Sequence, residues 1–115
     1  MARRDRDKLA EIIAHAETAM SSSATVSDLR ASEMVTDAVR MHLGQIGELA
    51  RADRVSRVTQ GAIPSVPWPE LRGMRNRIFH DSGNVDGDVV IDIVETDLPH
   101  LVAAIAEVLR QDELT

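Results

Sequence analysis

Apolar residues recur at helical spacing in three long stretches of the chain. In residues 5–20 they return every three or four positions, at Leu9, Ile12, Ile13, Ala16, Ala19 and Met20. Residues 32–53 contain no proline and carry a similar stripe, at Val35, Ala38, Val39, Ile46, Leu49 and Ala50. The last stripe includes Leu98, Leu101, Val102, Ile105, Val108 and Leu109. This spacing places apolar side chains on one face of an α-helix, so the pattern predicts three amphipathic helices.

Polar, glycine and proline residues separate these stretches and delimit a further helix. Residues 21–25 form a polar break, after which Ser27 offers an N-cap. Residues 54–60 fit a short helix, and Gly61 with residues 64–67 fits a loop. A fourth long helix is expected from about residue 68 to residue 80. Pro69 falls in its first turn, where the missing N–H does no harm, and residues 82–84 end it.

Residues 89–94 are rich in β-branched side chains and fit either a strand or a helix. A single strand would have no pairing partner, because no other segment alternates between apolar and polar residues. We therefore expect a helix there, kinked or broken by Pro99 near Asp97. The predicted fold is an all-α bundle of four long helices plus one or two short ones, in a single domain that spans residues 1–115.

Composition supports a helical core and excludes several kinds of site. The chain has 115 residues, which is enough for one domain, and only 2% are aromatic. Trp68 and Phe79, the two aromatic residues, are expected to be core anchors rather than base-stacking groups. The absence of cysteine excludes disulfides and thiolate metal sites. Gly44 and Gly47, three residues apart on the second predicted helix, allow a neighbouring backbone to approach.

Charge is distributed unevenly. The net charge is −6, but residues 1–80 carry +2 (12 basic and 10 acidic groups) and residues 81–115 carry −8 (1 basic and 9 acidic groups). An acidic protein is a poor general nucleic-acid binder, yet a small basic site remains compatible with it. The densest basic candidate is the group Arg72, Arg75 and Arg77. The longest apolar run has six residues, so no membrane contact is expected, and we expect a soluble, cytoplasmic protein.

The segment that carries chemistry contains Arg75, Asn76 and His80. On a helix, Asn76 and His80 share one face, whereas Arg75 and His80 lie about 140° apart around the axis and about 7.5 Å apart along it. A guanidinium suits the binding of a phosphate, and an imidazole suits proton transfer near neutral pH. Together these groups would hold an RNA phosphate and activate its 2′-hydroxyl without a metal ion. The alternative is an arginine-rich helix surface with a histidine that stabilises the helix end.

This segment resembles a known family. Arg75-Asn76-x-x-x-His80 resembles the R-x(4–6)-H signature of HEPN domains, and the wider chain resembles the HepT-like toxins of HepT/MntA toxin–antitoxin pairs. The supporting stretches are Asp37-Ala38-Val39, residues 46–50, Val66-Pro67-Trp68, Gly73-Met74-Arg75-Asn76 and Asp97-Leu98-Pro99-x-Leu101. The resemblance covers about residues 5–110.

The resemblance implies a HEPN-like helical bundle that forms a homodimer, with two R-x4-H motifs facing one cleft. It implies endoribonuclease activity through attack of the 2′-hydroxyl, with no metal or other cofactor. His80 would be the acid/base group, Arg75 would hold the phosphate and Asn76 would orient them, while Arg72 and Arg77 would contact the RNA. It also implies an MNT-type nucleotidyltransferase antitoxin as partner.

The chain departs from the family at one position. HepT-like proteins commonly continue R-x4-H-x-Y, with a tyrosine that the antitoxin can AMPylate, whereas here Ser82 stands at that position and the chain has no tyrosine. Inhibition by complex formation is then expected, with modification of Ser82 as the alternative. The substitution also leaves open a catalytically silent module that binds a nucleotidyltransferase partner or a nucleotide.

Several other residues have side chains suited to a site. Asn84, Asp86, Asp88 and Glu95 follow the spacing of a calcium loop, but Val89 stands where glycine is needed, so we expect these acids to cap a helix. Glu11 and His15 are two potential metal ligands, too few for a site, and we expect an exposed pair. The remaining candidates are His42 at a core edge or interface, His100 on the surface, and Arg51, Arg54 and Arg57 as a solvated face or basic rim.

Overall fold

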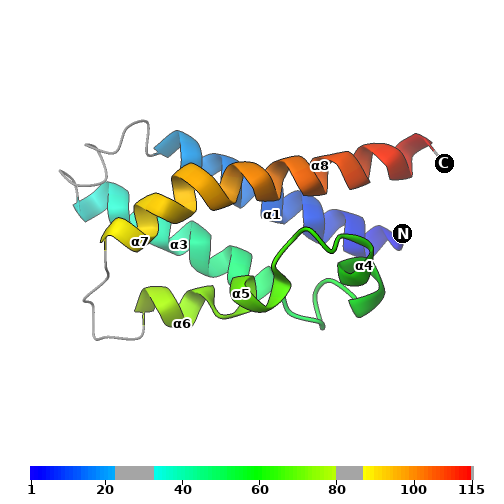
Figure 1. Ribbon diagram of the computed structural model, residues 1–115, viewed down its shortest axis with the longest axis horizontal. Helices are drawn as coiled ribbons and strands as arrows, with labels where there is room; N and C mark the ends of the chain where they lie inside the picture. Colours follow the sequence, from blue (N-terminus) through cyan, green and yellow to red (C-terminus); the bar gives the residue numbers. More distant parts are fainter. Residues whose placement is uncertain (23–32, 80–86, 115) are drawn as a thin grey trace.

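The computed structural model describes residues 1–22, 33–79 and 87–114, and every regular element in these ranges is a helix. Three helices are long: α1 (Arg3–Ser22), α3 (Glu33–Leu49) and α8 (Leu98–Leu114). Helix α1 packs against both α3 and α8, so the three form the body of the bundle (Figure 1). The prediction of an all-α bundle is confirmed.

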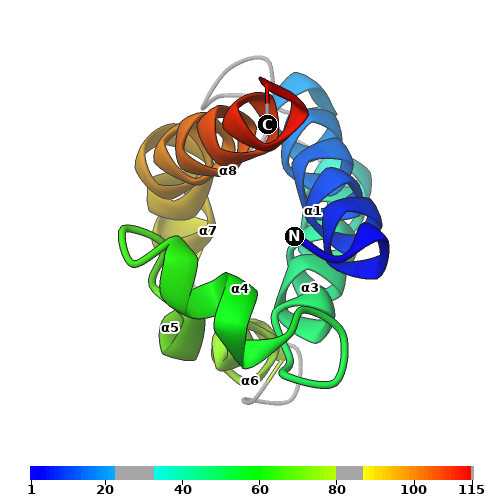
Figure 2. The ribbon, with the colours of Figure 1, turned by 90° about the vertical axis from the view of Figure 1, so that its right-hand side faces the viewer.

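Short helices complete the bundle. They are α4 (Arg57–Ala62), α5 (Trp68–Arg72), α6 (Met74–Phe79), α7 (Gly87–Asp92) and the π-helical turn η1 (Ile93–Asp97). Both α5 and α6 pack on α3. An end-on view shows α4, α5 and α6 across the bundle from α8 (Figure 2).

The prediction of the fourth long helix as one piece is wrong. The chain divides it at Gly73 into α5 and α6, and the second predicted helix ends at Leu49 rather than near residue 53. The N–H of Gly73 still bonds the carbonyl of Pro69 at 3.0 Å, but the regular helix stops there. Glycine is a weak helix former, and Leu71 and Met74 on either side of the break are both buried.

Residues 89–94 are helical, as expected, and belong to α7 and η1. The predicted disturbance near Asp97 is also confirmed. In η1 the N–H of Leu98 reaches back five residues to the carbonyl of Ile93, which is the bonding of a π-helix. The ring of Pro99 would clash with the carbonyl of Glu95 in a regular α-helix, so the wider turn relieves this contact.

The core lies between the long helices and the side formed by α4, α5 and α6. Its largest fully buried side chains include Leu9, Ile12, Leu43, Ile46, Leu98 and Ile105. Trp68 is buried as expected, and its Nε1–H donates to the carbonyl oxygens of Gln60 (3.0 Å) and Ile63 (3.1 Å). Trp68 therefore ties α5 to the end of α4. The side chain of Phe79 lies outside the described residues.

A buried carboxylate joins α4 to α1. Asp5 accepts hydrogen bonds from the Ser56 N–H (3.0 Å), the Ser56 hydroxyl (2.6 Å) and the Thr59 hydroxyl (2.6 Å). Ser56 is also the N-cap of α4, since its hydroxyl accepts from the Thr59 N–H. This network fixes the start of α4 against the first turns of α1.

None of the helices in the described ranges combines the length and the apolar character needed to cross a membrane.

Candidate functional site

The predicted catalytic segment begins on α6. Met74 and Ile78, one turn apart, are buried against the core, whereas Arg75 and Asn76 are exposed. One face of α6 is thereby fixed to α3, and the other presents the guanidinium and the amide to solvent. His80, Ser82 and the side chain of Arg77 lie outside the described residues.

Arg75 and Asn76 make no side-chain hydrogen bond or ion pair within the described part of the chain. Each is thus available to a ligand. No carboxylate offsets the positive charge of such an exposed guanidinium, and all five of its N–H donors can bind a phosphate.

Helix α3 sets the position of this segment through Gly47. A Cβ atom added at Gly47 would lie 2.7 Å from the carbonyl oxygen of Leu71 and 3.7 Å from the backbone nitrogen of Arg75. The backbone approach expected at Gly47 is therefore present, and it involves the chain on both sides of the α5–α6 break. Glycine is required here because any side chain would push α5 away from α3.

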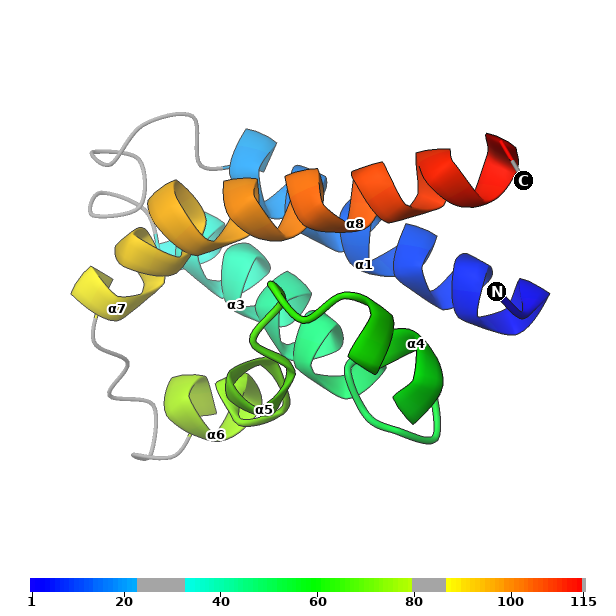
Figure 3. The same cartoon turned by 45° about the vertical axis from the view of Figure 1, so that its right-hand side comes forward.

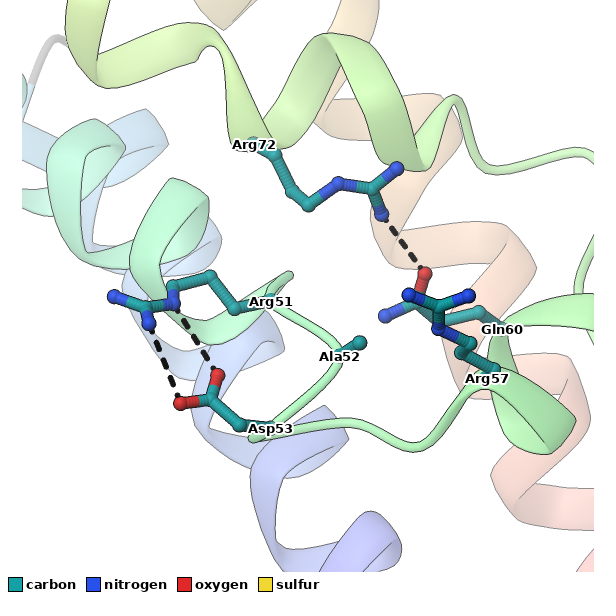
Figure 4. A pocket seen from close by; sticks show the side chains of 6 residues that line it. All are labelled: Arg51, Ala52, Asp53, Arg57, Gln60 and Arg72. Atoms are coloured by element: carbon teal, nitrogen blue, oxygen red, sulfur yellow. Dashed lines mark hydrogen bonds and ion pairs between the residues drawn. The ribbon is translucent and has the colours of Figure 1, made fainter.

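Arg72 ends α5 and is directed away from α6, toward α4 (Figure 4). Its Nη1 donates to Oε1 of Gln60 at 3.0 Å. The Gln60 side chain is buried, and its Nε2 donates to the carbonyl oxygens of Ala50 (3.0 Å) and Val55 (2.9 Å). The amide is thus held by the turn after α3, and it in turn holds the guanidinium of Arg72.

A pocket of about 550 Å³ lies beside this contact, lined by Arg51, Ala52, Asp53, Arg57, Gln60 and Arg72 (Figure 4). Sequence spacing grouped Arg51, Arg54 and Arg57 as a rim. The structure instead brings Arg51 and Arg57 together with Arg72, while Arg54 lines a neighbouring pocket. Nothing in the sequence pattern indicated that Arg72 belongs here, because the contact depends on how α5 packs beside α4.

The three histidines among the described residues are His15, His42 and His100. His15 is half-buried, and its Nδ1 lies 2.9 Å from Nδ1 of His42, so the expectation of an exposed Glu11–His15 pair is wrong. Glu11 instead faces Lys8, with Nζ–Oε distances of 3.5 Å. His42 lies at a core edge and His100 is exposed, both as expected.

The described residues contain no group of three histidine, aspartate or glutamate side chains arranged to bind a metal ion. The calcium-loop alternative fails locally, since residues 87–92 form a helix rather than an open loop. Asn84 and Asp86 lie outside the described residues, as does the side chain of Asp88.

Comparison with known proteins identifies the class. A family model described as ribonuclease HepT-like matches residues 9–108, nearly the whole chain. The helical bundle and the match together define a HEPN-type domain of a ribonuclease family that acts on RNA. The chain belongs to the HepT-like family. No solved structure matches the chain.

Proposed function

We propose that this protein is a metal-independent endoribonuclease whose active site is formed by Arg75, Asn76 and His80. The observation that carries the proposal is the exposed pair Arg75 and Asn76, without a partner among the described residues, on a helix fixed to α3 in a chain of the HepT-like family. His80 follows on the same segment. Arginine, an amide and histidine are sufficient to bind a phosphodiester and to move a proton from the attacking hydroxyl to the leaving oxygen.

The proposed reaction is an internal transesterification of the RNA strand. The imidazole of His80 takes the proton from a ribose 2′-hydroxyl, and the 2′-oxygen attacks the adjacent phosphorus. The bond to the 5′-oxygen of the next nucleotide breaks, and that oxygen takes up the proton that the imidazole removed. The products are a 2′,3′-cyclic phosphate and a free 5′-hydroxyl. Arg75 donates to the non-bridging oxygens, where negative charge increases in the transition state, and Asn76 orients the reacting groups.

The roles of Arg75 and Asn76 are separable from folding, because both side chains are exposed. We expect Arg75→Ala to reduce cleavage of tRNA in EDTA by at least about 100-fold, the scale of loss when one group that stabilises transition-state charge is removed. Asn76→Ala should cause a smaller loss. The melting temperature of both variants should stay close to that of the wild type. Arg110→Ala, which removes an arginine from α8, is the matched control and should cleave normally. Cleavage by Arg75→Ala at the wild-type rate would reject the assignment.

The proposal includes a homodimer with the two motifs at one cleft. Supporting it, Met34 and Met41 are 82% and 64% exposed and lie two turns apart on α3. Exposed apolar side chains aligned on one helix are typical of an interaction surface. Because α6 packs on α3, the helix that carries this stripe also supports the proposed catalytic segment.

We further propose a toxin–antitoxin role with an MNT-type nucleotidyltransferase as antitoxin. Since the chain has no tyrosine, inhibition would proceed by complex formation rather than by tyrosine AMPylation. Intact-mass spectrometry after coexpression with the antitoxin and ATP tests this. An unchanged mass supports inhibition by binding alone, whereas an added AMP would contradict it and make Ser82 the first position to examine for the modification.

The second candidate function is a silent HEPN module that binds a nucleotidyltransferase or a nucleotide. The observation that favours it is Ser82 at the position of the usual tyrosine. The two functions predict different effects in cells. A ribonuclease toxin should arrest growth when expressed alone and lose this effect in His80→Ala, whereas a silent module should leave growth unchanged in both forms.

A further inference from the structure

The pocket between the α3–α4 turn, α4 and α5 has an unbalanced positive charge. Arg51 is neutralised, since it pairs with Asp53 (Nε–Oδ1, 3.2 Å) and with Glu48 (Nη1–Oε1, 3.0 Å). Among the described residues, the Arg57 side chain makes no hydrogen bond or ion pair, and the Arg72 side chain donates to the neutral amide of Gln60. The pocket lining thus contains three arginines and one carboxylate, Asp53, and neither Arg57 nor Arg72 has a carboxylate partner among the described residues.

The Arg72 guanidinium is held in place without being neutralised. Both N–H groups of the Gln60 amide are used by Ala50 and Val55, so its oxygen is fixed in the direction of Arg72. One of the five N–H donors of Arg72 bonds this oxygen, and the others remain for a ligand. A guanidinium anchored by a neutral acceptor retains its charge and loses less conformational entropy when it binds an anion.

The pocket adjoins the proposed catalytic segment. Arg72 and Arg75 are three residues apart across the break at Gly73, so their Cα atoms are at most about 11 Å apart. A strand whose scissile phosphate lies at Arg75 has to extend past the α5–α6 break to reach Arg72, whose side chain is directed toward α4. The pocket volume of about 550 Å³ is within the usual range for small-ligand sites.

We propose that this pocket binds a backbone phosphate of the RNA strand next to the scissile phosphate, through Arg57 and Arg72. Its ligand follows from the proposed function, in which RNA is the substrate. Arg51 acts as a positioning residue, because its two carboxylate partners hold the turn that forms the pocket wall. The paired N–H donors of a guanidinium match the oxygens of a phosphodiester.

Binding of a single-stranded 2′-O-methyl oligoribonucleotide tests the proposal without any cleavage. Affinity is measured by fluorescence anisotropy at several salt concentrations for the wild type, Arg57→Gln and Arg72→Gln. Each substitution should weaken binding by about tenfold or more, the scale of one hydrogen bond to a charged group. Each should also reduce the slope of log affinity against log salt by about 0.7, the value for one lost phosphate contact on a single strand.

Two controls show whether such a loss comes from the pocket. Arg110→Gln removes the same charge from α8, lines no part of the pocket, and should bind like the wild type. Melting temperatures show whether each variant folds. Because the Arg57 side chain makes no hydrogen bond or ion pair among the described residues, Arg57→Gln keeps the test valid even if Arg72→Gln disturbs the contact between α5 and α4.

The outcomes separate the pocket from the ribonuclease. The proposal is overturned if the pocket variants bind RNA with the affinity and salt slope of the wild type. Carboxylates of a protein partner would then be the next ligands to test for this pocket. Binding that is weakened in both variants, with a reduced salt slope, supports the pocket even if the wild-type protein cleaves no RNA. Cleavage that depends on His80, with unchanged binding by the pocket variants, would keep the ribonuclease and reject the pocket.

Discussion

Asp5 has a structural role that its position in the sequence does not reveal. Its position near the start of a helix predicts only a favourable interaction between its negative charge and the helix N-terminus. In the structure it is buried and accepts three hydrogen bonds from Ser56 and Thr59, more than 50 positions along the chain. Burial acts to raise the pKa of Asp5, but the hydrogen bonds from Ser56 and Thr59, with the nearby charge of Arg4, lower it below the usual value.

Replacement of this carboxylate should destabilise the fold. Asp5→Ala leaves the donors of Ser56 and Thr59 without their acceptor, so we expect the free energy of unfolding to fall by about 3 kcal/mol at neutral pH. Urea denaturation measures this change. Asp7→Ala, an exposed position on the same helix, is the control and should change stability little. Equal effects of the two substitutions would show that the Asp5 network contributes nothing.

His15 and His42 form a partly buried polar contact between α1 and α3. The pKa of His15 is lowered by burial and by the charge of His42, while Glu11 acts in the opposite direction. The folded chain therefore disfavours the protonated form that the unfolded chain accepts near pH 6.5. Since the unfolded state binds the proton first, stability is retained above pH 6.5 and decreases as the pH falls below it.

The melting temperature should accordingly fall between pH 7.5 and pH 5.5. His15→Gln should reduce this pH dependence, because residue 15 then carries no proton-binding group. His100→Gln, at an exposed position, should retain the wild-type dependence. A parallel loss of stability in the wild type and His15→Gln would show that His15 is not the group responsible.

At the scale of elements, the long helices were predictable and the break between α5 and α6 was not. The apolar stripes of α1, α3 and α8 each extend over several turns, so their periodicity is clear from local sequence alone. The break at Gly73 and the approach at Gly47 depend on how α5 and α6 meet α3. Sequence spacing indicated that a backbone would approach Gly47, but it did not show which one.

Gly47→Ala tests that approach directly. The added methyl group would lie 2.7 Å from a backbone oxygen of Leu71, which cannot rotate away, so α5 must shift. We expect a loss of about 1–3 kcal/mol in the free energy of unfolding, the usual cost of overpacking. Gly61→Ala on α4 is the matched control, since a Cβ there has no neighbour within 4 Å. Alanine is the better helix former, so the control should gain up to about 1 kcal/mol.

At the scale of the whole molecule, the candidate site lies on the side formed by α4, α5 and α6 (Figure 3). Helix α8, which carries Glu107, Asp112 and Glu113, lies across the bundle from α6 (Figures 1 and 2). The three carboxylates of α8 are thus separated from the basic surface, whereas Glu70 and Asp97 line a cavity beside Leu71 and Met74. Residues 73–76 of that surface could be selected as candidates from the sequence, because they form one contiguous motif. The pocket was not, because Arg51, Arg57 and Arg72 come from separate parts of the chain.

The proposed dimer is testable through the exposed apolar stripe of α3. Met41→Glu places a charge on this stripe, and burial of an unpaired charge in an interface is unfavourable. Sedimentation velocity should show a shift of Met41→Glu from dimer to monomer, with a parallel loss of cleavage. Val58→Glu, at a position 85% exposed on α4, should remain dimeric. A wild-type protein that sediments as a monomer would contradict the composite cleft.

The proposed ribonuclease activity is tested most simply by the cleavage of RNA by purified protein in EDTA, with wild type and His80→Ala side by side. We predict that only the wild type cleaves, leaving 2′,3′-cyclic phosphate ends, and that a 2′-deoxy nucleotide at the cleavage site blocks the reaction. Equal cleavage by His80→Ala, or cleavage of the 2′-deoxy substrate, would contradict the proposed mechanism.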